Sequence, residues 1–564
     1  AAAANDNAPA ASSNPAAPPT AGPGSAVAAV TALKGGAHPR TKQVSNARMA
    51  EIAREIPFNT PEYEAAARRA AEEAGIDYVP MSGTREEIIA RLVKYDWTPS
   101  EADLQHAKDA AAAAKAENLV PNETVTSQVF FTKPAVDMSG ANTDMYGALI
   151  DQIEHAQKIH ASLYGIDSVP ELVQALRDAK ARGAEIKLNV DQNPDGTFTY
   201  PGTQALIDEF GTDVVRVERT GKYAIMHDKF WIFDDEKVWT GSTNINASAI
   251  GKGYNNEVSV LVDSKNLAAT FEAEHAQQWA GFSHAKKQAV GAQNQIPQSA
   301  DGVGVEAYFS PKEDAITKGI LPQIEAAQTS MHLSLFHFSD PKLAQAMIDA
   351  KNRGVDVKMI IDASGAANAA TRKNVELLRA AGIPVKVENW GGKQHMKGGV
   401  IDGKNSIIGS MNWTNSGAKK NDENVLIFKN DAALGARMDE QFADSFASLP
   451  TLTLFGYFAA EGLNSISTMV DGSDNDHFGG KDPYLSWQQY TKALGEISTA
   501  AVKMAAAEGA DLAIEAKEQA LGILRGEVNK AKARLIQWAG GTKADLVISK
   551  IDADLDSQIS KHSL

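Results

Sequence analysis

The sequence predicts an α/β protein made of two related halves, with helical extensions before and after them. Two observations lead to this prediction. From about residue 121 to residue 450, apolar strand-like runs alternate with helical patterns, which is typical of α/β folds. The order of elements also occurs twice, since QIEHAQ at Gln152 returns as QIEAAQ at Gln323, 171 residues later. Two copies of so long a unit indicate a pseudo-dimer within one chain, because solenoids repeat short units many times.

The 564 residues are too many for one ordinary domain, and a hydrophobic content of 43% allows a large core. Composition divides the chain into five parts. They are a flexible Ala/Pro-rich arm (1–45), a helical N-terminal segment (46–120), a first half (121–295), a second half (296–450) and a helical C-terminal extension (451–564). Within the halves, ARGAEIKLNVD ending at Asp191 matches NRGVDVKMIID ending at Asp362. Each copy therefore runs helix, strand, helix, strand and crossover before its distinctive motif.

That motif reads H-x-K-x4-D-x6-G-S-x-N and begins at His227 in the first copy and at His395 in the second. An apolar stretch, a turn with Asp and an apolar return predict a β-hairpin. Residues two apart on a strand face the same side, so each imidazole should project beside its lysine, Lys229 or Lys397. An imidazole next to an ammonium can attack or protonate an ester while its anionic oxygens are bound.

The end of each motif offers further hydrogen-bond donors. Gly-Ser-x-Asn places Ser242 and Asn244 after the first hairpin, and Ser410 and Asn412 after the second. A glycine lets a ligand approach the backbone, and a hydroxyl and an amide can donate to phosphate oxygens. We therefore expect these four side chains to bind the phosphate of a substrate held between the facing halves.

Two complete motifs inside a visible repeat resemble the signature of the phospholipase D superfamily, over roughly residues 130–450. The resemblance implies two α/β sandwiches related by a pseudo-two-fold axis, with the active site at their interface. It also implies a two-step reaction without metal, in which one His forms a phosphohistidine and the other protonates the leaving alcohol. By the usual order in the family, His227 is expected to be the nucleophile and His395 the acid and base. Lys229 and Lys397 would hold the nonbridging oxygens together with the two asparagines.

The same resemblance assigns supporting carboxylates. Glu257 in YNNEV and Glu423 in KNDENV are expected to orient the catalytic histidines, because a carboxylate on one ring nitrogen fixes the tautomer. Asp234 and Asp402 belong to the motif and are counted among the catalytic residues, with an orienting role. An aspartate at a hairpin turn is also commonly structural.

The substrate class stays open between two kinds of phosphodiester. The family includes phospholipases, nucleases and phosphatidyl-transfer synthases, and the text around the motifs is similar to bacterial secreted-type phospholipase D and nuclease-like members. The net charge of −16 disfavours nonspecific DNA binding. A glycerophospholipid at a membrane surface is therefore the expected partner, and nucleic acid is the alternative. The phosphate is expected to bind in a small basic pocket that contains only Lys229 and Lys397. Two complete motifs disfavour a non-enzymatic binding protein.

Metals, cofactors and membrane spans are not expected. The chain has no cysteine for a thiolate zinc site, and no apolar run approaches 18 residues. It begins AAAANDNAPA without Met, which is typical of a mature chain after signal-peptide removal. Together with the lack of cysteine, this predicts a secreted or periplasmic protein. The internal pseudo-dimer favours a monomer.

Overall fold

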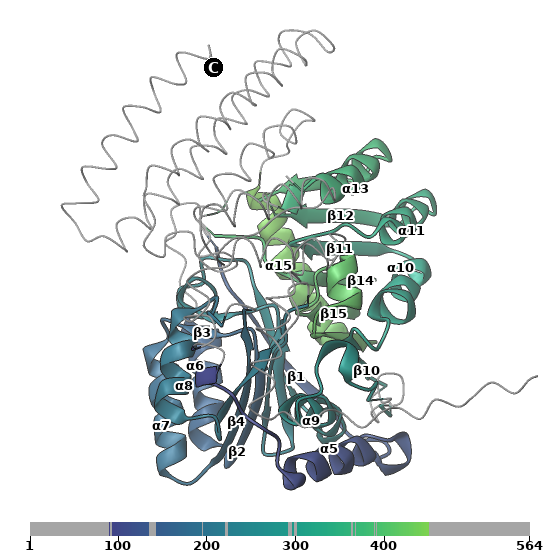
Figure 1. Ribbon diagram of the computed structural model, residues 1–564. Coiled ribbons are helices and arrows are strands. Elements are labelled where there is room, and N and C mark those ends of the chain that lie inside the picture. Colours follow the sequence, from purple (N-terminus) through teal and green to yellow (C-terminus); the bar gives the residue numbers. More distant parts are fainter. Residues whose placement is uncertain are drawn as a thin grey trace, which may run out of the picture.

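The computed structural model describes residues 90, 93–134, 143–193, 196–219, 224–290, 296–297, 302–362, 365–366, 368–388, 390 and 392–449. The predicted arm at 1–45 and the C-terminal extension at 451–564 therefore lie outside the described residues, as does most of the segment at 46–120. The described part consists of two halves, which Figure 1 shows with the first half in blue to teal below the second half in green.

The first half contains a seven-stranded sheet in the order β1-β9-β7-β6-β2-β4-β5. Its strands are β1 (Thr126–Phe131), β2 (Lys158–Leu163), β4 (Glu185–Gln192), β5 (Val215–Arg219), β6 (Lys229–Phe233), β7 (Lys237–Gly241) and β9 (Val258–Asp263). Neighbours β2, β4 and β5 run parallel, and every other neighbouring pair is antiparallel. The parallel part follows the strand–helix alternation of the sequence, because a parallel connection needs a crossover helix.

The second half repeats this sheet strand for strand, in the order β10-β16-β15-β14-β11-β12-β13. Its strands are β10 (Gly304–Ser310), β11 (Ser330–Leu335), β12 (Asp356–Ile361), β13 (Val385–Val387), β14 (Lys397–Ile401), β15 (Asn405–Gly409) and β16 (Glu423–Lys429). The parallel and antiparallel pairings also match those of the first sheet. The predicted α/β fold with two related halves is thus confirmed.

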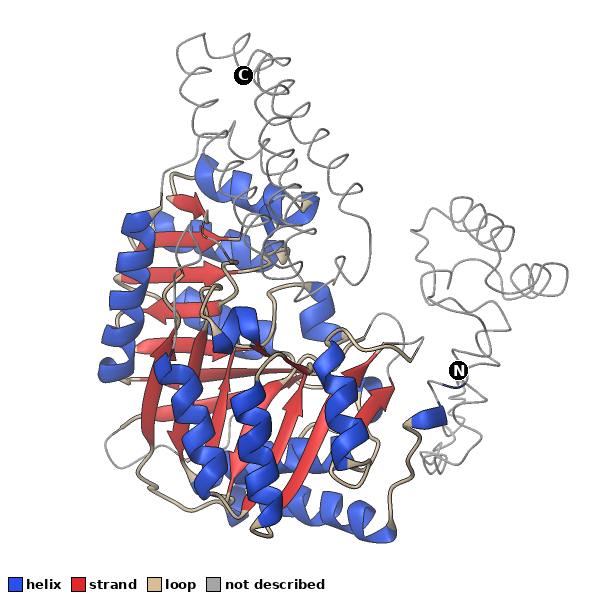
Figure 2. Ribbon diagram, turned by 90° about the vertical axis from the view of Figure 1, so that its left-hand side faces the viewer, coloured by secondary structure: helices blue, strands red, loops and turns tan. Residues whose placement is uncertain are grey.

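Helices cover both faces of each sheet (Figure 2). The α-helices include α5 (Glu101–Ala113), α6 (Thr143–His155), α7 (Pro170–Ala181), α8 (Pro201–Phe210), α9 (Lys265–Trp279), α10 (Leu321–Ala326), α11 (Pro341–Asn352), α13 (Ala369–Ala380), α14 (Asn415–Lys419) and α15 (Ala432–Ser448). Other elements are η2 (Ala116–Asn118), β3 (Ile166–Asp167), β8 (Ile245–Asn246), η3 (Ala247–Gly251), η4 (His284–Lys286) and η5 (Ala315–Ile320). Helix α5 lies in the predicted helical N-terminal segment (46–120), and Ser100 caps its N-terminus by accepting from the backbone N–H of Asp103.

The three largest apolar clusters of the described residues form most of the core. One lies between the first sheet and α6 to α8, and a second lies between the second sheet and α10, α11 and α13. The third contains α9, α15 and the inner faces of both sheets, with Phe230 and Phe271 from the first half and Phe309 and Phe428 from the second. Because this shared cluster joins the two halves, the ends of their strands are held in a fixed relation.

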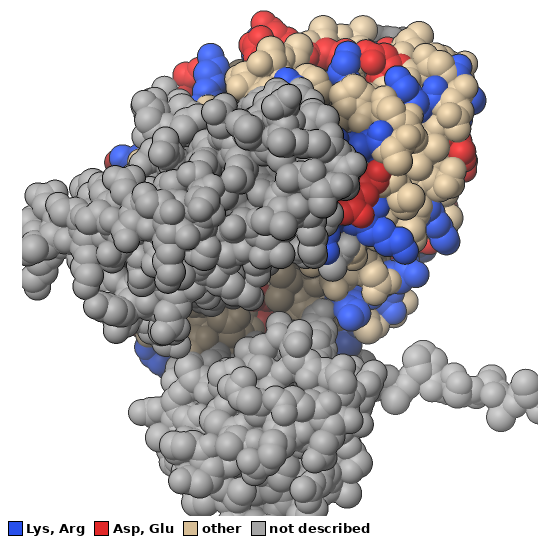
Figure 3. Space-filling model, turned by 90° about the horizontal axis from the view of Figure 1, so that it is seen from above, with Lys and Arg blue, Asp and Glu red and all other residues tan. Residues whose placement is uncertain are grey.

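The surface of the described part carries both signs of charge, and Figure 3 shows lysines and arginines among acidic side chains on the face seen from above. Within the described residues, no helix is both long and apolar enough to cross a membrane.

Candidate active site at the junction of the two halves

Each motif forms the hairpin that its sequence predicts, with the histidine two residues before the first strand residue. β6 pairs with β7, and β14 pairs with β15. The backbone at each histidine bridges to the opposite half. The N–H of His227 donates to the carbonyl of Asp422 at 2.8 Å, and the N–H of His395 donates to the carbonyl of Asn256 at 3.0 Å. These two short parallel bridges bring the motifs together.

Each imidazole is held by a glutamate of the other half. Nδ1 of His227 lies 2.7 Å from Oε2 of Glu423, and Nδ1 of His395 lies 3.0 Å from Oε2 of Glu257. All four side chains are at least 95% buried. The resemblance indicated both glutamates as orienting residues. It gave no sign that the pairs are exchanged between halves, because Glu257 follows His227 in sequence and Glu423 follows His395.

The glutamates are themselves held by two matching pairs of polar side chains. The hydroxyl of Ser242 donates to Glu257 at 2.6 Å, and that of Ser410 donates to Glu423 at 2.8 Å. Each glutamate also accepts from the amide two residues before it, Asn255 or Asn421. A carboxylate with several fixed donors keeps one orientation, so these contacts fix the histidine rings.

The two serines therefore differ from their predicted role as phosphate ligands. A hydroxyl has one proton to donate, and in each serine that proton goes to the glutamate. The oxygen of Ser242 accepts from the backbone N–H of Val258, and that of Ser410 accepts from the N–H of Asn424. Nothing remains to donate to a substrate, and both side chains are fully buried.

Both lysines of the motifs lie close to their histidines. Nζ of Lys229 donates to the carbonyl of His227 at 2.9 Å, and Lys397 donates in the same way to His395. An aromatic ring contacts each pair at the same place. Tyr164 packs edge-on against His227, with 5.2 Å between the two ring centroids. Nζ of Lys229 lies 5.6 Å from the centroid of the Tyr164 ring.

Phe336 takes the place of Tyr164 in the second half. Its ring packs edge-on against His395 at 5.0 Å, and Nζ of Lys397 lies 4.9 Å from its centroid. Nζ of Lys393 lies over the same ring, at 4.4 Å. The expected pocket with only two lysines is thus incomplete, because a third lysine lies beside the second motif. Lys393 precedes the second motif and is not one of the positions that the two motifs share, so the repeat could not reveal it.

The two motif asparagines have amide atoms without a partner. Asn244 is 1% exposed, and neither its amide nitrogen nor its oxygen has a hydrogen-bond partner among the described residues. The oxygen of Asn412 likewise lacks one within the described part. Burying an unpaired amide is costly, so these groups fit a site whose ligand supplies the missing hydrogen bonds.

Asp234 and Asp402 do not lie at this site, which corrects their prediction as catalytic residues. Each follows the last residue of a five-residue strand that begins at the motif lysine, and such a strand spans about 16 Å. Both adopt a positive φ, 54° and 53°, at the hairpin turn. Their carboxylates accept backbone N–H groups at the start of the neighbouring strand: Gln157 and Lys158 for Asp234, and Gln328, Thr329 and Ser330 for Asp402.

Two other aspartates do support the site. Asp191 accepts from the N–H of Met226 at 2.8 Å, and Asp362 accepts from the N–H of Gln394 at 3.1 Å. Each acceptor thus fixes the residue directly before a motif histidine. The sequence contained a signal for both, since they end the matched runs ARGAEIKLNVD and NRGVDVKMIID, but they lie too far from the motifs in sequence to be assigned to them.

Burial and charge set the protonation of the central groups. Burial raises the pKa of Glu257 to about 7, against the opposing effect of Lys397 and several hydrogen bonds. Burial also lowers the pKa of His227, and the charges of Lys229 and Lys397 act in the same direction while Glu423 opposes them. A neutral His227 can act as a nucleophile, since the attacking ring nitrogen must carry a lone pair.

The layer behind the histidines differs between the halves. Asp422 forms an ion pair at 2.7 Å with Lys287, which is fully buried and also pairs with Glu274. Burial lowers the pKa of Lys287, but these carboxylates outweigh it and raise that pKa above its usual value. The equivalent of Asp422 in the first half is the neutral Asn256, which donates to the amide oxygen of Gln394 at 2.6 Å.

Potential metal ligands occur in the described part in two places outside the histidine pair. One group is Glu218, His284 and Asp422, and the other is His106, His160 and Glu272. The catalytic candidates themselves form no such group among the described residues. Two opposed imidazoles with two lysines can perform nucleophilic attack and proton transfer on a bound anion without a metal.

The chain matches the family model described as "Cardiolipin synthase, PLD-like domain" at residues 149–279 and 320–446, one segment in each half. It is 37% identical over 117 residues to the mitochondrial cardiolipin hydrolase of Xenopus laevis, covering 21% of this chain and 55% of that protein. It is 31% identical over 162 residues to the phospholipase D of Rickettsia typhi, covering 29% of this chain and 70% of that protein. The match thus spans only about half the length of the cardiolipin hydrolase.

Among solved structures, the nuc protein of Salmonella typhimurium, a phospholipase D family member, is similar with a TM-score of 0.25 and 28% identity. The alignment covers 26% of this chain and 97% of that one.

Proposed function

The chain belongs to the phospholipase D superfamily, and from this premise we propose that it is a phosphodiesterase that hydrolyses glycerophospholipids as a phospholipase D. The observation that carries the proposal is the exchanged pairing of His227 with Glu423 and of His395 with Glu257. Each ring then has Nδ1 held by a carboxylate and Nε2 as the reactive nitrogen. Two such rings from opposite halves suit the two ends of one displacement at phosphorus.

In the first step, Nε2 of His227 attacks phosphorus and a P–N bond forms. The bond from phosphorus to the headgroup oxygen breaks, and the N–H of His395 gives its proton to that oxygen. Glu423 stabilises the positive charge that develops on His227, because its carboxylate accepts the hydrogen bond from Nδ1. The lowered pKa of His227 supports its assignment as the nucleophile.

In the second step, the now neutral His395 takes a proton from water, and the resulting hydroxide oxygen bonds to phosphorus. The P–N bond breaks, which releases the phosphate monoester and restores both histidines to their starting states. An alcohol in place of water would give transfer of the phosphatidyl group by the same steps.

Negative charge on the nonbridging oxygens grows in both steps. Lys229 and Lys397 supply the positive charge that stabilises it, and Asn244 and Asn412 supply amide donors. Donors fixed before the reaction stabilise the transition state most, because they need no reorganisation. The unpartnered amide of Asn244 supports this role.

A lipid substrate is favoured by the names of the relatives, a cardiolipin hydrolase and a phospholipase D. It is also favoured by the net charge of −16, which repels a nucleic acid. Nucleic acid remains the second candidate because the described residues expose few large apolar side chains that could contact a lipid surface. These side chains are Val93, Val120 and Leu377, one on each of three separate segments.

The experiment offers the purified full-length protein, in EDTA, mixed phospholipid vesicles and, separately, single- and double-stranded DNA. We expect headgroup release that needs no metal and responds mildly to salt, because binding one phosphate displaces few counterions. His227→Ala is the matched inactive control. DNA cleavage at lower enzyme concentration than lipid, with a steep loss at moderate salt, would assign a nuclease. Reversible loss of activity in EDTA, with the fold intact by circular dichroism, would overturn the metal-free reaction.

Two further predictions concern the whole protein. A secreted or periplasmic location is tested by fractionating cells that produce the native gene product. A monomeric state is tested by light scattering of the purified chain.

A further inference from the structure

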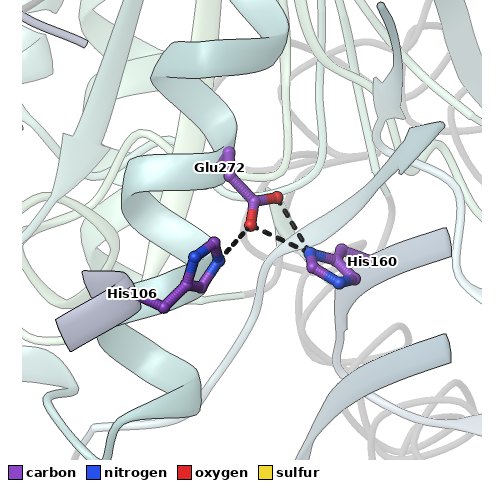
Figure 4. Close-up of side chains that lie close together, drawn as sticks. All are labelled: His106, His160 and Glu272. Carbon is purple, nitrogen blue, oxygen red and sulfur yellow. Dashed lines mark hydrogen bonds and ion pairs between the residues drawn. The ribbon is translucent and has the colours of Figure 1, made fainter. Parts of the chain in front are cut away.

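Two histidines and a glutamate, each from a different element, meet where α5, β2 and α9 approach one another (Figure 4). His106 lies on α5, His160 on β2 and Glu272 on α9. Nε2 of His106 lies 2.7 Å from Oε1 of Glu272, and Nδ1 of His160 lies 2.9 Å from Oε2 of the same carboxylate. One ligand atom from each residue lies within 4.8 Å of the other two.

This donor set is chemically suited to a transition-metal dication. Two imidazole nitrogens and a carboxylate oxygen are ligands that Zn²⁺ binds at about 2.0–2.2 Å. Four-coordinate zinc holds neighbouring ligands roughly 3.3 Å apart, so side-chain shifts of about half an ångström would open the hydrogen-bonded triad around an ion. The side chain of His106 is 35% exposed, which gives an ion access from solvent.

The surroundings of His160 supply a second, independent indication. Its other nitrogen, Nε2, lies 3.2 Å from Oε1 of Glu185. Histidines that bind a metal almost always donate their second ring N–H to a carboxylate or carbonyl, which fixes the tautomer. The side chain of His160 is fully buried, so both contacts are shielded from water. A metal bound to Nδ1 would leave the contact of Nε2 with Glu185 in place.

The cluster is separate from the proposed active site. Leu163 of β2 pairs with Lys229, whereas His160 pairs with Ile232, three positions along the strand. Three positions correspond to about 10 Å, and an odd separation places the side chains on opposite faces of the sheet. His160 therefore faces α5 and α9, away from the face that carries Lys229.

The second half provides an internal comparison. His332 occupies the position of His160, with Nδ1 2.7 Å from Asp439 of α15 and Nε2 3.5 Å from Asp356. These acids correspond to Glu272 and Glu185. Within the described residues, the second half has no counterpart of α5, and no group of potential metal ligands includes His332. The third ligand, His106 of α5, thus has no counterpart among the described residues of the second half.

We propose that His106, His160 and Glu272 bind one transition-metal dication, with Zn²⁺ as the reference ion and water completing its coordination. The ion fastens α5, which precedes the repeated unit, to β2 and α9 of the first half. Its role is structural, and the phosphodiesterase reaction does not pass through it.

The test uses the full-length chain, freed of metal with a chelator that is then removed, and Zn²⁺ added alone. Calorimetry is expected to give one strong site per chain, and Zn²⁺ is expected to raise the melting temperature. His106→Gln should weaken Zn²⁺ binding at least tenfold and remove most of the rise in melting temperature. His332→Gln, at the equivalent position of the second half, should leave both unchanged.

Cobalt supplies a readout that needs no variant. Co²⁺ bound by two imidazoles, a carboxylate and water should give the strong visible absorption of a four-coordinate ion, and Zn²⁺ should displace it. The proposal is overturned if no stoichiometric site is found, or if His106→Gln and Glu272→Gln both bind Zn²⁺ like the unchanged protein. Neither outcome bears on the phosphodiesterase proposal, since turnover is not the quantity measured.

Discussion

The two halves of the molecule agree where they touch the reacting groups and differ one layer further back. Each half gives the other a glutamate, Glu257 or Glu423, and each glutamate is held by a serine and an asparagine at equivalent positions. Behind this layer, the second half has Asp422 paired with the buried Lys287, whereas the first half has Asn256 on Gln394.

The difference shows which contacts the chemistry requires from both halves. A displacement at phosphorus needs a base or acid at each end, so both imidazoles need an oriented ring. It does not need the same support behind them. We expect the asymmetry behind the rings, including the different charge at positions 256 and 422, to underlie the different roles proposed for the two histidines.

The largest expected effect comes from removing either ring. His227→Ala and His395→Ala should each lower turnover by about 10⁴-fold or more, because nucleophile and acid act as a unit. His395→Asn should leave a covalent adduct on His227, since attack can occur but the second step lacks its base. Mass spectrometry of the protein after incubation with substrate locates the phosphoryl group. An adduct on His395 in a His227→Asn variant, and none in the converse one, would reverse the roles.

The exchanged pairing itself is tested in the His395→Asn background. Adding Glu423→Gln should slow formation of the His227 adduct by about 100-fold, because Glu423 stabilises the charge on that ring. Adding Glu257→Gln should change the rate only a few-fold, since the ring that Glu257 orients is already gone. Rapid-quench measurement of adduct formation compares the two. Equal slowing by both would mean that the pairing is not specific to each ring.

The asymmetric layer is tested through stability. Asp422→Asn leaves Lys287 with one carboxylate partner fewer in a fully buried site and should lower the free energy of unfolding by about 3 kcal/mol. Asn256→Ser, at the equivalent position, removes two neutral hydrogen bonds, to Gln394 and from Gln441, and should cost about 2 kcal/mol. Urea unfolding of both variants measures the difference. Similar losses would show that the buried ion pair adds little beyond its hydrogen bonds.

The pH dependence should report Glu257, whose pKa burial raises to about 7. Below that pH the protonated carboxyl no longer carries the negative charge that stabilises a protonated His395, so kcat/KM should fall as the pH falls through about 7. Stability has the opposite sign. The folded protein holds this proton more tightly than the unfolded chain, so the contribution is present below about pH 4.5 and lost as the pH rises through 7. Glu257→Gln should flatten that part of the stability profile.

The smallest effects are expected at the hairpin turns. Asp402 accepts three backbone N–H groups and the hydroxyl of Thr329, whereas Asp234 accepts two backbone N–H groups. Asp402→Ala should therefore destabilise the protein by about 2 kcal/mol and Asp234→Ala by about 1 kcal/mol, with little change in kcat. Thermal melts and turnover of the folded variants measure both. A large loss of kcat without a loss of stability would return these aspartates to the active site.

Much of the fold could be predicted because the repeat is visible in the sequence. The match of Gln152 with Gln323, and of Asp191 with Asp362, places two copies of one α/β unit, and hairpin residues mark both motifs. The histidines, lysines and asparagines follow from the same spacing. A local pattern is enough for these predictions because each depends on residues close together in sequence.

Contacts between distant residues could not be predicted in the same way. Nothing in the spacing shows that Glu423 pairs with His227 rather than with His395, because the pairing depends on how two folded halves dock. For the same reason the serines were assigned to phosphate instead of to glutamate, and Lys393 was not anticipated. Asp234 and Asp402 were assigned to the active site because they belong to the same sequence motif as the lysines. In the structure, a five-residue strand separates each aspartate from its motif lysine.

The exchange of glutamates has a consequence for how the protein comes into being. During synthesis the first half leaves the ribosome before the second exists, and its His227 lacks a carboxylate until Glu423, 196 residues later, has been made and folded against it. The imidazole of the second half likewise depends on a docked first half for Glu257. A chain with only one half folded therefore holds neither histidine–glutamate pair, and under the proposed reaction it should be inactive toward phosphodiesters.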